Sequence, residues 1–175
     1  EVPQLSHFTG KVIYDRMETT GQFETSNEVI NQTFKNAYWG IRGNYRGMPT
    51  DCPQRDERQG WLGDRATGCF GEAFIFRNAM LYSKWLQDIE DSQSPEGSIS
   101  VVTPRYWTHY NDDVTWPAAY FYAAQMLWQQ YGDTAPIMKH YASMKRYLER
   151  IREVSMQEYI LTKDTYGDWC MPPEK

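Results

Sequence analysis

Cysteine is scarce in this chain, and its spacing argues against the simplest metal and disulfide arrangements. Only three cysteines occur in 175 residues, at Cys52, Cys69 and Cys170. No two of them form a CxxC pair, which argues against a structural zinc site. An odd number of widely separated cysteines predicts no disulfide framework, so cysteine usage leaves the redox compartment open.

Positive charge and long apolar runs are also lacking. The 18 Lys and Arg residues are outnumbered by 23 Asp and Glu residues, which gives a formal net charge of -5. A nucleic-acid-binding surface requires clustered cations, so this balance argues against a nucleic-acid partner. No apolar run approaches the roughly 18 residues of a membrane span, and no signal peptide is evident. The chain opens at Glu1 without a methionine, so we expect it to be a piece of a longer polypeptide.

Aromatic rings, by contrast, are abundant. They make up 15% of the sequence, with 7 Trp and 13 Tyr. A hydrophobic core built on large rings is the preferred interpretation for most of them. The alternative is a carbohydrate cleft, in which the apolar C–H faces of a sugar pack on indole rings while carboxylates and Arg bind the hydroxyl groups.

Two regions of different character divide the chain. Residues 1–24 have an extended or β pattern with a strand-like run at 11–14. We interpret them as the end of an upstream β domain plus a linker. Residues 25–175 have the periodicity of helices separated by loops.

Four helices are predicted in the second region. A hydroxyl at Thr25 and a carboxylate at Glu28 match a capping box before the first helix. Pro117 and Gly132 suit the start and the end of the third helix. Long loops are predicted between the first three helices, and long loops inside compact domains are usually functional. The helices span residues 26–43, 68–90, 117–131 and 134–154, and the long loops span residues 44–66 and 91–112.

The predicted helices differ in how many of their faces are apolar. Helix 68–90 has apolar residues on two faces, which predicts burial on both sides, whereas helix 134–154 has one apolar stripe opposite a charged face. The stripe consists of Ile137, Tyr141, Met144, Leu148 and Ile151. Alternation of doubly covered and amphipathic helices is typical of two concentric rings, as in an α/α toroid. A plain four-helix bundle is the alternative, and the pattern barely separates the two.

The segment from Asp51 to Asp64 reads DCPQRDERQGWLGD and concentrates charge around one indole. It holds four carboxylates, two cations and one Trp. Like charges at this density repel one another and cost stability unless a function compensates. Gly60 and Gly63 permit tight turns that aim Trp61 and Asp64 into a cleft. This composition is typical of a sugar site, and a solvated charged loop is the alternative.

Two further clusters mix acids with indoles at expected helix boundaries or loops. One comprises residues 111–113 with Trp116, and the other comprises residues 166–169. Helix boundaries on one rim of a toroid converge on its mouth, so both clusters are candidates for the same cleft. For Asp113 the alternative is capping of the following helix.

DCPQRDERQGWLGD closely resembles the signature of glycoside hydrolase family 78, the bacterial α-L-rhamnosidases, and the DVTWP and YGDW segments also resemble that family. The resemblance extends over residues 26–169. It implies an all-α fold that is part of an (α/α)6 six-hairpin toroid and follows β-sandwich domains. Residues 25–175 are then the N-terminal, incomplete part of the catalytic domain, and the remaining catalytic and β-sandwich domains of the parent chain are its partners.

The same resemblance implies inverting hydrolysis of terminal α-L-rhamnosides, with a rhamnose-containing oligosaccharide or glycoside as the substrate. From this substrate class we expect a periplasmic or extracellular bacterial enzyme. Glu57 is the implied general acid. The implied sugar-binding residues are Asp51, Arg55, Asp64, Trp61, Trp116 and Trp169, of which the three indoles would enclose the ring and its C6 methyl group.

The chemistry of the residues agrees with this implication. An inverting glycosidase needs one protonated carboxyl group at the leaving oxygen and a second carboxylate roughly 6.5–9.5 Å away that activates water. Asp56 and Glu57 are adjacent, so we expect their side chains to diverge, with Asp56 beside Arg58. The resemblance places the water-activating base outside this chain. Within it, the first candidates for that base are Asp112, Asp113 and Asp168.

Two other functions stay open. A non-catalytic carbohydrate-binding toroid would keep the aromatic residues, and the presence of Glu57 favours catalysis over it. A metal-dependent enzyme would bind Ca²⁺ or Mg²⁺ through the oxygens of Asp51, Asp56, Asp112 and Asp113. The neighbouring Arg55 and Arg58 disfavour a metal, because a cation beside a metal ion is costly. We therefore predict no metal and no cofactor, and we assign no role to His7, His109 or His140.

Overall fold

The structure, a computed structural model, describes residues 2–106, 110–169 and 172. Its regular elements are helical apart from a two-stranded antiparallel pair, β1 (Met156–Gln157) and β2 (Ile160–Leu161). The helices are η1 (Leu5–His7), α1 (Glu28–Gly43), α2 (Leu62–Ala66), α3 (Gly68–Ile75), α4 (Ala79–Asp91), α5 (Ala118–Tyr131) and α6 (Ala135–Val154). The predicted all-α class is confirmed. None of these helices is long and apolar enough to cross a membrane.

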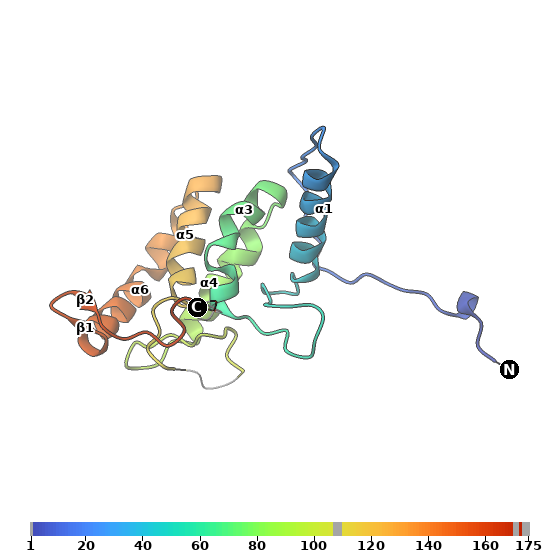
Figure 1. The fold of residues 1–175 in the computed structure, drawn as a ribbon. Coiled ribbons are helices and arrows are strands. Elements are labelled where there is room, and N and C mark those ends of the chain that lie inside the picture. Colours follow the sequence, from blue (N-terminus) through green and yellow to red (C-terminus); the bar gives the residue numbers. More distant parts are fainter. Residues whose placement is uncertain (1, 107–109, 170–171, 173–175) are drawn as a thin grey trace.

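Helix α5 lies at the centre of the packed part of the molecule (Figure 1). It packs against α2, α3, α4 and α6, and its buried residues include three alanines, Ala119, Ala123 and Ala124. The small alanine side chains let neighbouring helices approach closely. The core around α5 contains Trp85, Leu86, Tyr120, Leu127 and Tyr147. The predicted limits of α5 agree with the structure, since Pro117 is its N-cap and Gly132 its left-handed C-cap, with a φ of 67°.

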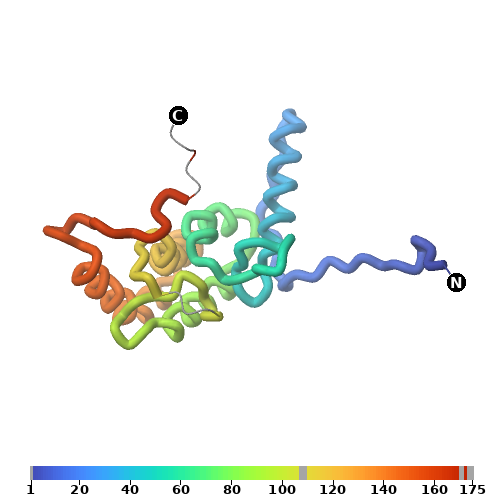
Figure 2. Tube along the Cα trace, turned by 60° about the horizontal axis from the view of Figure 1, so that its bottom comes forward, coloured from blue at the N-terminus to red at the C-terminus, as the bar shows by residue number. Residues whose placement is uncertain are grey.

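Helix α1 and the N-terminal arm stand apart from this packed group (Figures 1 and 2). No residue of α1 is buried. The helix is tied to the rest mainly by aromatic contacts, such as the Tyr38 and Phe76 rings at 5.0 Å, and Arg42 lies 3.5 Å over the ring of Tyr14. Val29 and Ile30 of this helix are exposed, whereas Phe34, Tyr38 and Ile41 are half-buried.

Two predictions near the N-terminus are wrong. The N-cap of α1 is Asn27, whose side chain accepts hydrogen bonds from the N–H groups of Val29 and Ile30, so Thr25 and Glu28 do not form a capping box. Asparagine is as good an N-cap as threonine. Because Asn27 caps the helix, α1 begins at Glu28. The run at 11–14 forms no strand, because no partner strand lies beside it in the described chain.

The helix predicted over 68–90 is interrupted. It divides into α3 and α4, because Phe76 adopts an extended conformation with φ -125° and ψ 145°. Thr19 forms a β-bridge with Phe76, and the N–H of Arg77 donates to the carbonyl of Glu18. The ring of Phe76 is buried, so a contact with a segment more than 50 residues earlier overrides the local helical pattern. Another short helix, α2, forms inside the predicted loop 44–66.

The buried face of α6 also differs from the predicted stripe. Tyr141 and Leu148 are exposed, whereas His140 and Tyr147 are buried. His140 Nδ1 lies 2.6 Å from the Glu90 carboxylate, so a polar partner brings this histidine inside. His140 therefore has a structural contact, and the buried face of the helix is shifted toward it.

The segment after β2 decides the shape of the functional region. It leaves the hairpin at the far end of α6 and returns across the ends of the helices toward residues 110–117 and α2 (Figures 1 and 2). It has no regular secondary structure through residue 169, so side-chain contacts hold it in place. Residues His109 and Cys170 lie outside the described part of the chain, while Cys52 and Cys69 are buried and carry no disulfide.

Candidate active site

One cavity collects the residues that the sequence singled out. It has a volume of about 470 Å³ and lies where the loop before α2, the start of α5 and the returning C-terminal segment meet. Its lining residues are Asp51, Arg55, Glu57, Trp61, Gly63, Asp64, Trp116, Tyr166 and Trp169. All seven predicted site residues are in this set. Residues more than 100 positions apart in the sequence therefore face the same space.

The loop that carries the acids closes on itself through Asp51. The N–H of Asp51 donates to the Gln59 carbonyl at 2.9 Å, and Asp51 Oδ1 accepts the Gln59 N–H at 2.7 Å. The Asp51 side chain is only 4% exposed. Its Oδ2 is buried without a hydrogen-bond partner among the described residues, at 3.7 Å from Arg55. A buried carboxylate oxygen without a donor is costly, so this oxygen is suited to accept a hydrogen bond from a ligand.

Glu57 and Asp56 point in different directions, as predicted. Arg55 approaches Glu57 Oε2 with its Nε at 2.7 Å and its Nη2 at 2.6 Å, at the edge of the cavity. This hydrogen bond raises the pKa of Arg55. The Asp56 side chain is fully exposed and pairs with Arg58 at 3.3 Å. A positive φ of 43° at Arg58 turns the chain between the two acids and the Gln59 contact.

Asp64 enters the cavity from the first turn of α2. Partial burial raises the pKa of Asp64, and repulsion from Asp51 adds to the effect. Gly63 precedes it and lies against Trp116, because a Cβ at this position would come within 2.3 Å of the indole. Gly60 has a similar role, since its Cβ would lie 1.8 Å from the Thr103 carbonyl oxygen. The two glycines are therefore required by close approach and not by turn geometry alone.

A buried ion pair supports this acidic side of the cavity from behind. Arg65 Nη1 lies 2.7 Å from Glu72 Oε1, with side chains only 11% and 3% exposed. Glu72 Oε2 also accepts the hydroxyl protons of Tyr45 and Tyr82, each at 2.5 Å, and burial raises the pKa of both tyrosines. Arg65 Nη2 donates to the Thr50 carbonyl at 2.9 Å. Because Thr50 precedes Asp51 and Arg65 follows Asp64, this network fixes both ends of the acidic segment.

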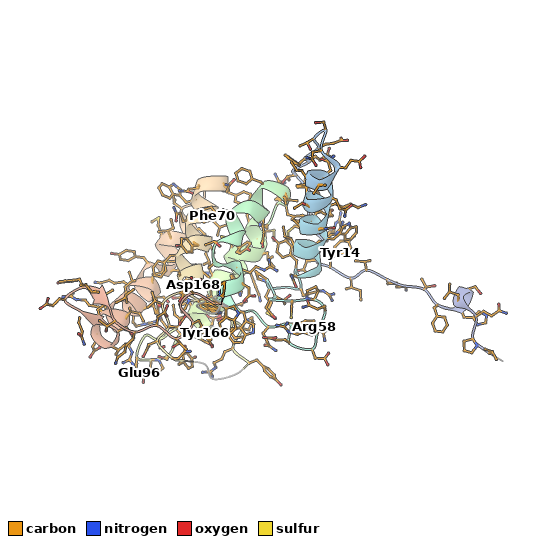
Figure 3. All side chains as sticks on the ribbon, in the orientation of Figure 1. Tyr14, Arg58, Phe70, Glu96, Tyr166 and Asp168 are labelled. Carbon is orange, nitrogen blue, oxygen red and sulfur yellow. The ribbon has the colours of Figure 1, made fainter. Side chains whose placement is uncertain are left out.

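Aromatic rings form the opposite side of the cavity. The Trp116 and Tyr166 rings lie 4.6 Å apart, Trp169 lies 6.0 Å from Trp116, and Trp61 lies 6.1 Å from Tyr166. Tyr166 touches all three indoles and was not among the predicted site residues. The signal was present, because Tyr166 belongs to the acid–indole segment at 166–169, but the sequence does not show which ring of that segment faces inward. Figure 3 labels Tyr166 and Asp168 on this segment and Arg58 on the loop before α2.

The three acids named as alternatives for the water-activating base do not line the cavity. Asp112 pairs with Arg150 of α6 at 2.8 Å, which lowers the pKa of Asp112. Asp113 is buried and accepts the Trp116 N–H at 2.8 Å, but it does not cap α5, whose N-cap is Pro117 without a side-chain cap. Asp168 is exposed.

The four oxygen ligands considered for a metal are also not gathered in one place. Asp56 and Asp112 pair with arginines of different segments. A different trio, Asp51, Cys52 and Glu57, brings one ligand atom from each residue within 4.8 Å in the described part of the chain. The Arg55 guanidinium forms ion pairs with Asp51 and Glu57, at 3.7 and 2.6 Å. Its positive charge opposes a metal ion at this position.

Comparisons with known proteins identify the fold. The family model of the bacterial alpha-L-rhamnosidase 6 hairpin glycosidase domain matches residues 18–175. The structure of alpha-L-rhamnosidase from Dictyoglumus thermophilum superposes with a TM-score of 0.93 at 41% identity, over 99% of this chain and 20% of that protein. The Streptomyces avermitilis alpha-L-rhamnosidase complexed with L-rhamnose gives 0.87 at 32% identity, over 91% of this chain and 16% of that protein. An alpha-L-rhamnosidase of Formosa agariphila is 31% identical over 98% of this chain and 18% of that protein.

The chain thus spans about a fifth or less of the length of these relatives. Its helices correspond to part of a six-hairpin ring, which confirms the predicted partial toroid over a four-helix bundle. The boundary predicted between residues 24 and 25 stays a prediction. Because the family model matches far more than half of the chain, the chain belongs to the bacterial alpha-L-rhamnosidase six-hairpin glycosidase domain family.

Proposed function

We propose that the full-length protein hydrolyses terminal α-L-rhamnosides and that this chain supplies its general acid and most of its sugar pocket. The observation that carries the proposal is the cavity, which joins acids, one arginine and three indoles in a chain 32% identical to an alpha-L-rhamnosidase complexed with L-rhamnose. Carboxylates and guanidinium groups bind hydroxyls, and indole faces bind the C–H face of a sugar. The remaining domains of the parent chain would complete the enzyme.

The two sides of the cavity divide the recognition of the sugar. Asp51, Arg55 and Asp64 would bind the ring hydroxyls, and the orphan Oδ2 of Asp51 gains a donor when a hydroxyl arrives. Rhamnose differs from most hexoses by its C6 methyl group, which prefers an apolar environment. Trp61, Trp116 and Trp169 would enclose the ring and this methyl group, and Tyr166 holds the three indoles together.

Glu57 is the proposed general acid. In the reaction, a water oxygen bonds to the anomeric carbon while the bond from that carbon to the leaving oxygen breaks. Glu57 transfers its proton to the leaving oxygen, and a base accepts a proton from the water. Both contacts from Arg55 fall on Oε2 of Glu57, so we expect the transferred proton on Oε1.

The water-activating base is expected from elsewhere in the protein. One oxygen of Asp51 lies within 4.8 Å of one oxygen of Glu57, which is closer than the roughly 6.5–9.5 Å that an attacking water requires in an inverting enzyme. Asp112, Asp113 and Asp168 do not line the cavity. We therefore propose a carboxylate from the part of the catalytic domain that lies outside this chain.

The test is hydrolysis of an aryl α-L-rhamnoside by the full-length protein, with the anomer of the first product followed by NMR. We expect turnover in the presence of a chelator and β-L-rhamnose as the first product. Release of α-L-rhamnose would contradict inversion, and loss of turnover to the chelator would favour the metal-dependent alternative. Rhamnose binding without hydrolysis would favour a carbohydrate-binding protein, and absence of both would overturn the proposal.

A further inference from the structure

Two carboxylates behind the aromatic side of the cavity connect segments that are distant in sequence. Asp113, before α5, accepts the N–H groups of Thr165 and Tyr166 with Oδ1, at 3.0 and 3.1 Å. Asp164, on the returning C-terminal segment, accepts the Val114 N–H with Oδ1 at 2.9 Å and also accepts the hydroxyl of Thr115. Each carboxylate thus binds donors of the other segment, and the contacts are reciprocal.

The donors of these contacts belong to the aromatic side of the cavity or adjoin it. The Trp116 N–H donates to Asp113 Oδ2 at 2.8 Å, and the Tyr166 N–H donates to Oδ1 of the same carboxylate. One side chain therefore sets the separation of two backbone sites whose rings lie 4.6 Å apart. Asp113 itself is 0% exposed, and its carbonyl accepts the Tyr147 hydroxyl at 2.6 Å, which anchors it to α6.

On the basis of the proposed function, we propose that Asp113 and Asp164 are positioning residues, which together clamp Trp116 and Tyr166 in the arrangement that receives the apolar face of the sugar. Neither residue lines the cavity, so they act through the rings and do not touch the substrate. The returning segment has no strand or helix of its own between residues 162 and 169, so these hydrogen bonds carry much of its positioning.

The charges around the clamp make it dependent on protonation. The nearby cation Arg150 of α6 is already bound to Asp112, and Lys163 lines a neighbouring polar cavity together with Asp112 and Asp164. Apart from the interaction of the two acids with each other, the partners of Asp113 and Asp164 in the described chain are N–H groups and one hydroxyl. Burial and the nearby Asp164 raise the pKa of Asp113 to about 6, whereas the pKa of Asp164 is lowered by its hydrogen bonds to Asp113 and to the donors around residues 114–115.

With a proton on Asp113, only Asp164 is charged, so the two acids do not repel each other and the clamp is stable. Above about pH 6 both acids carry a charge, and their repulsion opposes the closed arrangement. The Tyr147 hydroxyl faces this region and keeps its proton, because burial raises the pKa of Tyr147 far above the range in which the acids titrate. The separation of Trp116 and Tyr166 is then expected to respond to pH in this window.

The test uses the full-length protein with Asp164→Ala, Asp164→Asn and the control Asp133→Ala. Asp133 also accepts a backbone N–H, that of Ala135, but at the opposite end of α5. Near-UV circular dichroism reports the packing of the rings, and calorimetry reports the affinity for L-rhamnose. For Asp164→Ala we expect an altered near-UV spectrum and about tenfold weaker binding. Asp133→Ala should change neither, although both variants lose a hydrogen bond.

Asp164→Asn keeps the shape of the side chain and removes its charge. At every pH tested, its affinity for rhamnose should equal that of the wild type below about pH 5. Between about pH 5 and pH 8 the wild type should lose ring packing and affinity with a midpoint near 6, and Asp164→Asn should not. An unchanged near-UV spectrum in Asp164→Ala, or the wild-type pH profile in Asp164→Asn, would overturn the clamp. Failure of the proposed function is distinct, because a protein that binds no rhamnose still reports the clamp through its spectrum.

Discussion

The two sides of the cavity rest on buried carboxylates that are stabilised in different ways. Behind the acidic side, Glu72 is neutralised by Arg65 at 2.7 Å and accepts two tyrosine hydroxyls. Behind the aromatic side, Asp113 has no such cation in the described part of the chain, and another carboxylate, Asp164, accepts the same Thr165 N–H. One side is therefore held by an ion pair and the other by backbone donors and a proton.

Because of this difference, the two sides of the cavity respond differently to pH. An arginine stays charged at every pH that a folded protein experiences, so Arg65 keeps its charge behind Asp51 and Asp64 near neutrality. A carboxyl pair does titrate, so the rings that it holds respond to pH. The support of the acidic side is therefore independent of pH near neutrality, and the support of the aromatic side depends on pH.

Glu57→Gln tests the acidic side with the largest expected effect. The amide keeps the shape and lacks the acidic proton, so turnover of natural rhamnosides should fall by about 10²–10⁴-fold. The loss should be smaller for aryl rhamnosides with a good leaving group, which need little protonation, and rhamnose binding should persist in calorimetry. Asp56→Asn is the matched control, because the neighbouring Asp56 is fully exposed and should tolerate the change. Equal losses on all substrates would show that Glu57 is not the acid.

Arg65→Met tests the buried support of the same side. Removing the cation leaves Glu72 buried without its charge partner, which should destabilise the domain by about 3–5 kcal/mol. The measurement is the urea dependence of tryptophan fluorescence in the full-length protein. Arg58→Met removes an exposed pair and should leave the unfolding midpoint nearly unchanged. Equal stability of the two variants would mean that the Arg65–Glu72 pair does not support the loop.

Trp116→Ala tests the aromatic side. Loss of a large apolar contact should weaken L-rhamnose binding by about 1–3 kcal/mol in calorimetry, and discrimination against L-lyxose, which lacks the methyl group, should fall. Trp169→Ala should act in the same direction with a smaller effect, because Trp169 is 64% exposed. Trp128→Ala, on an exposed part of α5, is the control. Unchanged affinity in Trp116→Ala would place that indole in the core and outside the sugar site.

The smallest expected effect is a change in the free energy of unfolding with pH, which should come from the Asp113–Asp164 pair and not from the Arg65–Glu72 pair. Because the pKa of Asp113 is raised to about 6 in the folded state, its contribution is complete below about pH 4 and is lost as the pH rises through 6. The loss should amount to about 1–2 kcal/mol in urea unfolding between about pH 4 and pH 7. The lowered pKa of Asp164 acts in the opposite sense, and its contribution is lost as the pH falls below about 4 toward 2.

Asp113→Asn should reduce that pH dependence, while Glu72→Gln should leave it in place. The comparison is made between each variant and the wild type, because Asp64 and Asp112 also titrate with shifted pKa values. An identical slope of stability against pH in the wild type and in Asp113→Asn would show that the carboxyl pair is not the titrating element.

Several features follow from the sequence by itself because their causes are local. Helix α5 begins and ends where Pro117 and Gly132 place it, since proline presets the first turn and glycine adopts the left-handed C-cap without strain. The divergence of Asp56 and Glu57 follows from their adjacency. The composition of the segment from Asp51 to Asp64 indicates a sugar site, and the segment lines one cavity with Trp116 and Trp169, in agreement with the family resemblance.

Features that depend on distant partners could not be predicted from local patterns. Periodicity continues through Phe76, yet its pairing with Thr19 divides the helix there. The inward position of Tyr166 and the joint role of Asp113 and Asp164 depend on a segment that returns across about 50 residues of sequence. Local patterns report which face of an element is apolar, but they do not report which remote donor meets a given carboxylate. The free energy of these contacts is gained only when the distant segments meet in the folded chain. The sequence therefore indicates which residues are candidates, and the folded structure shows which of them contact each other.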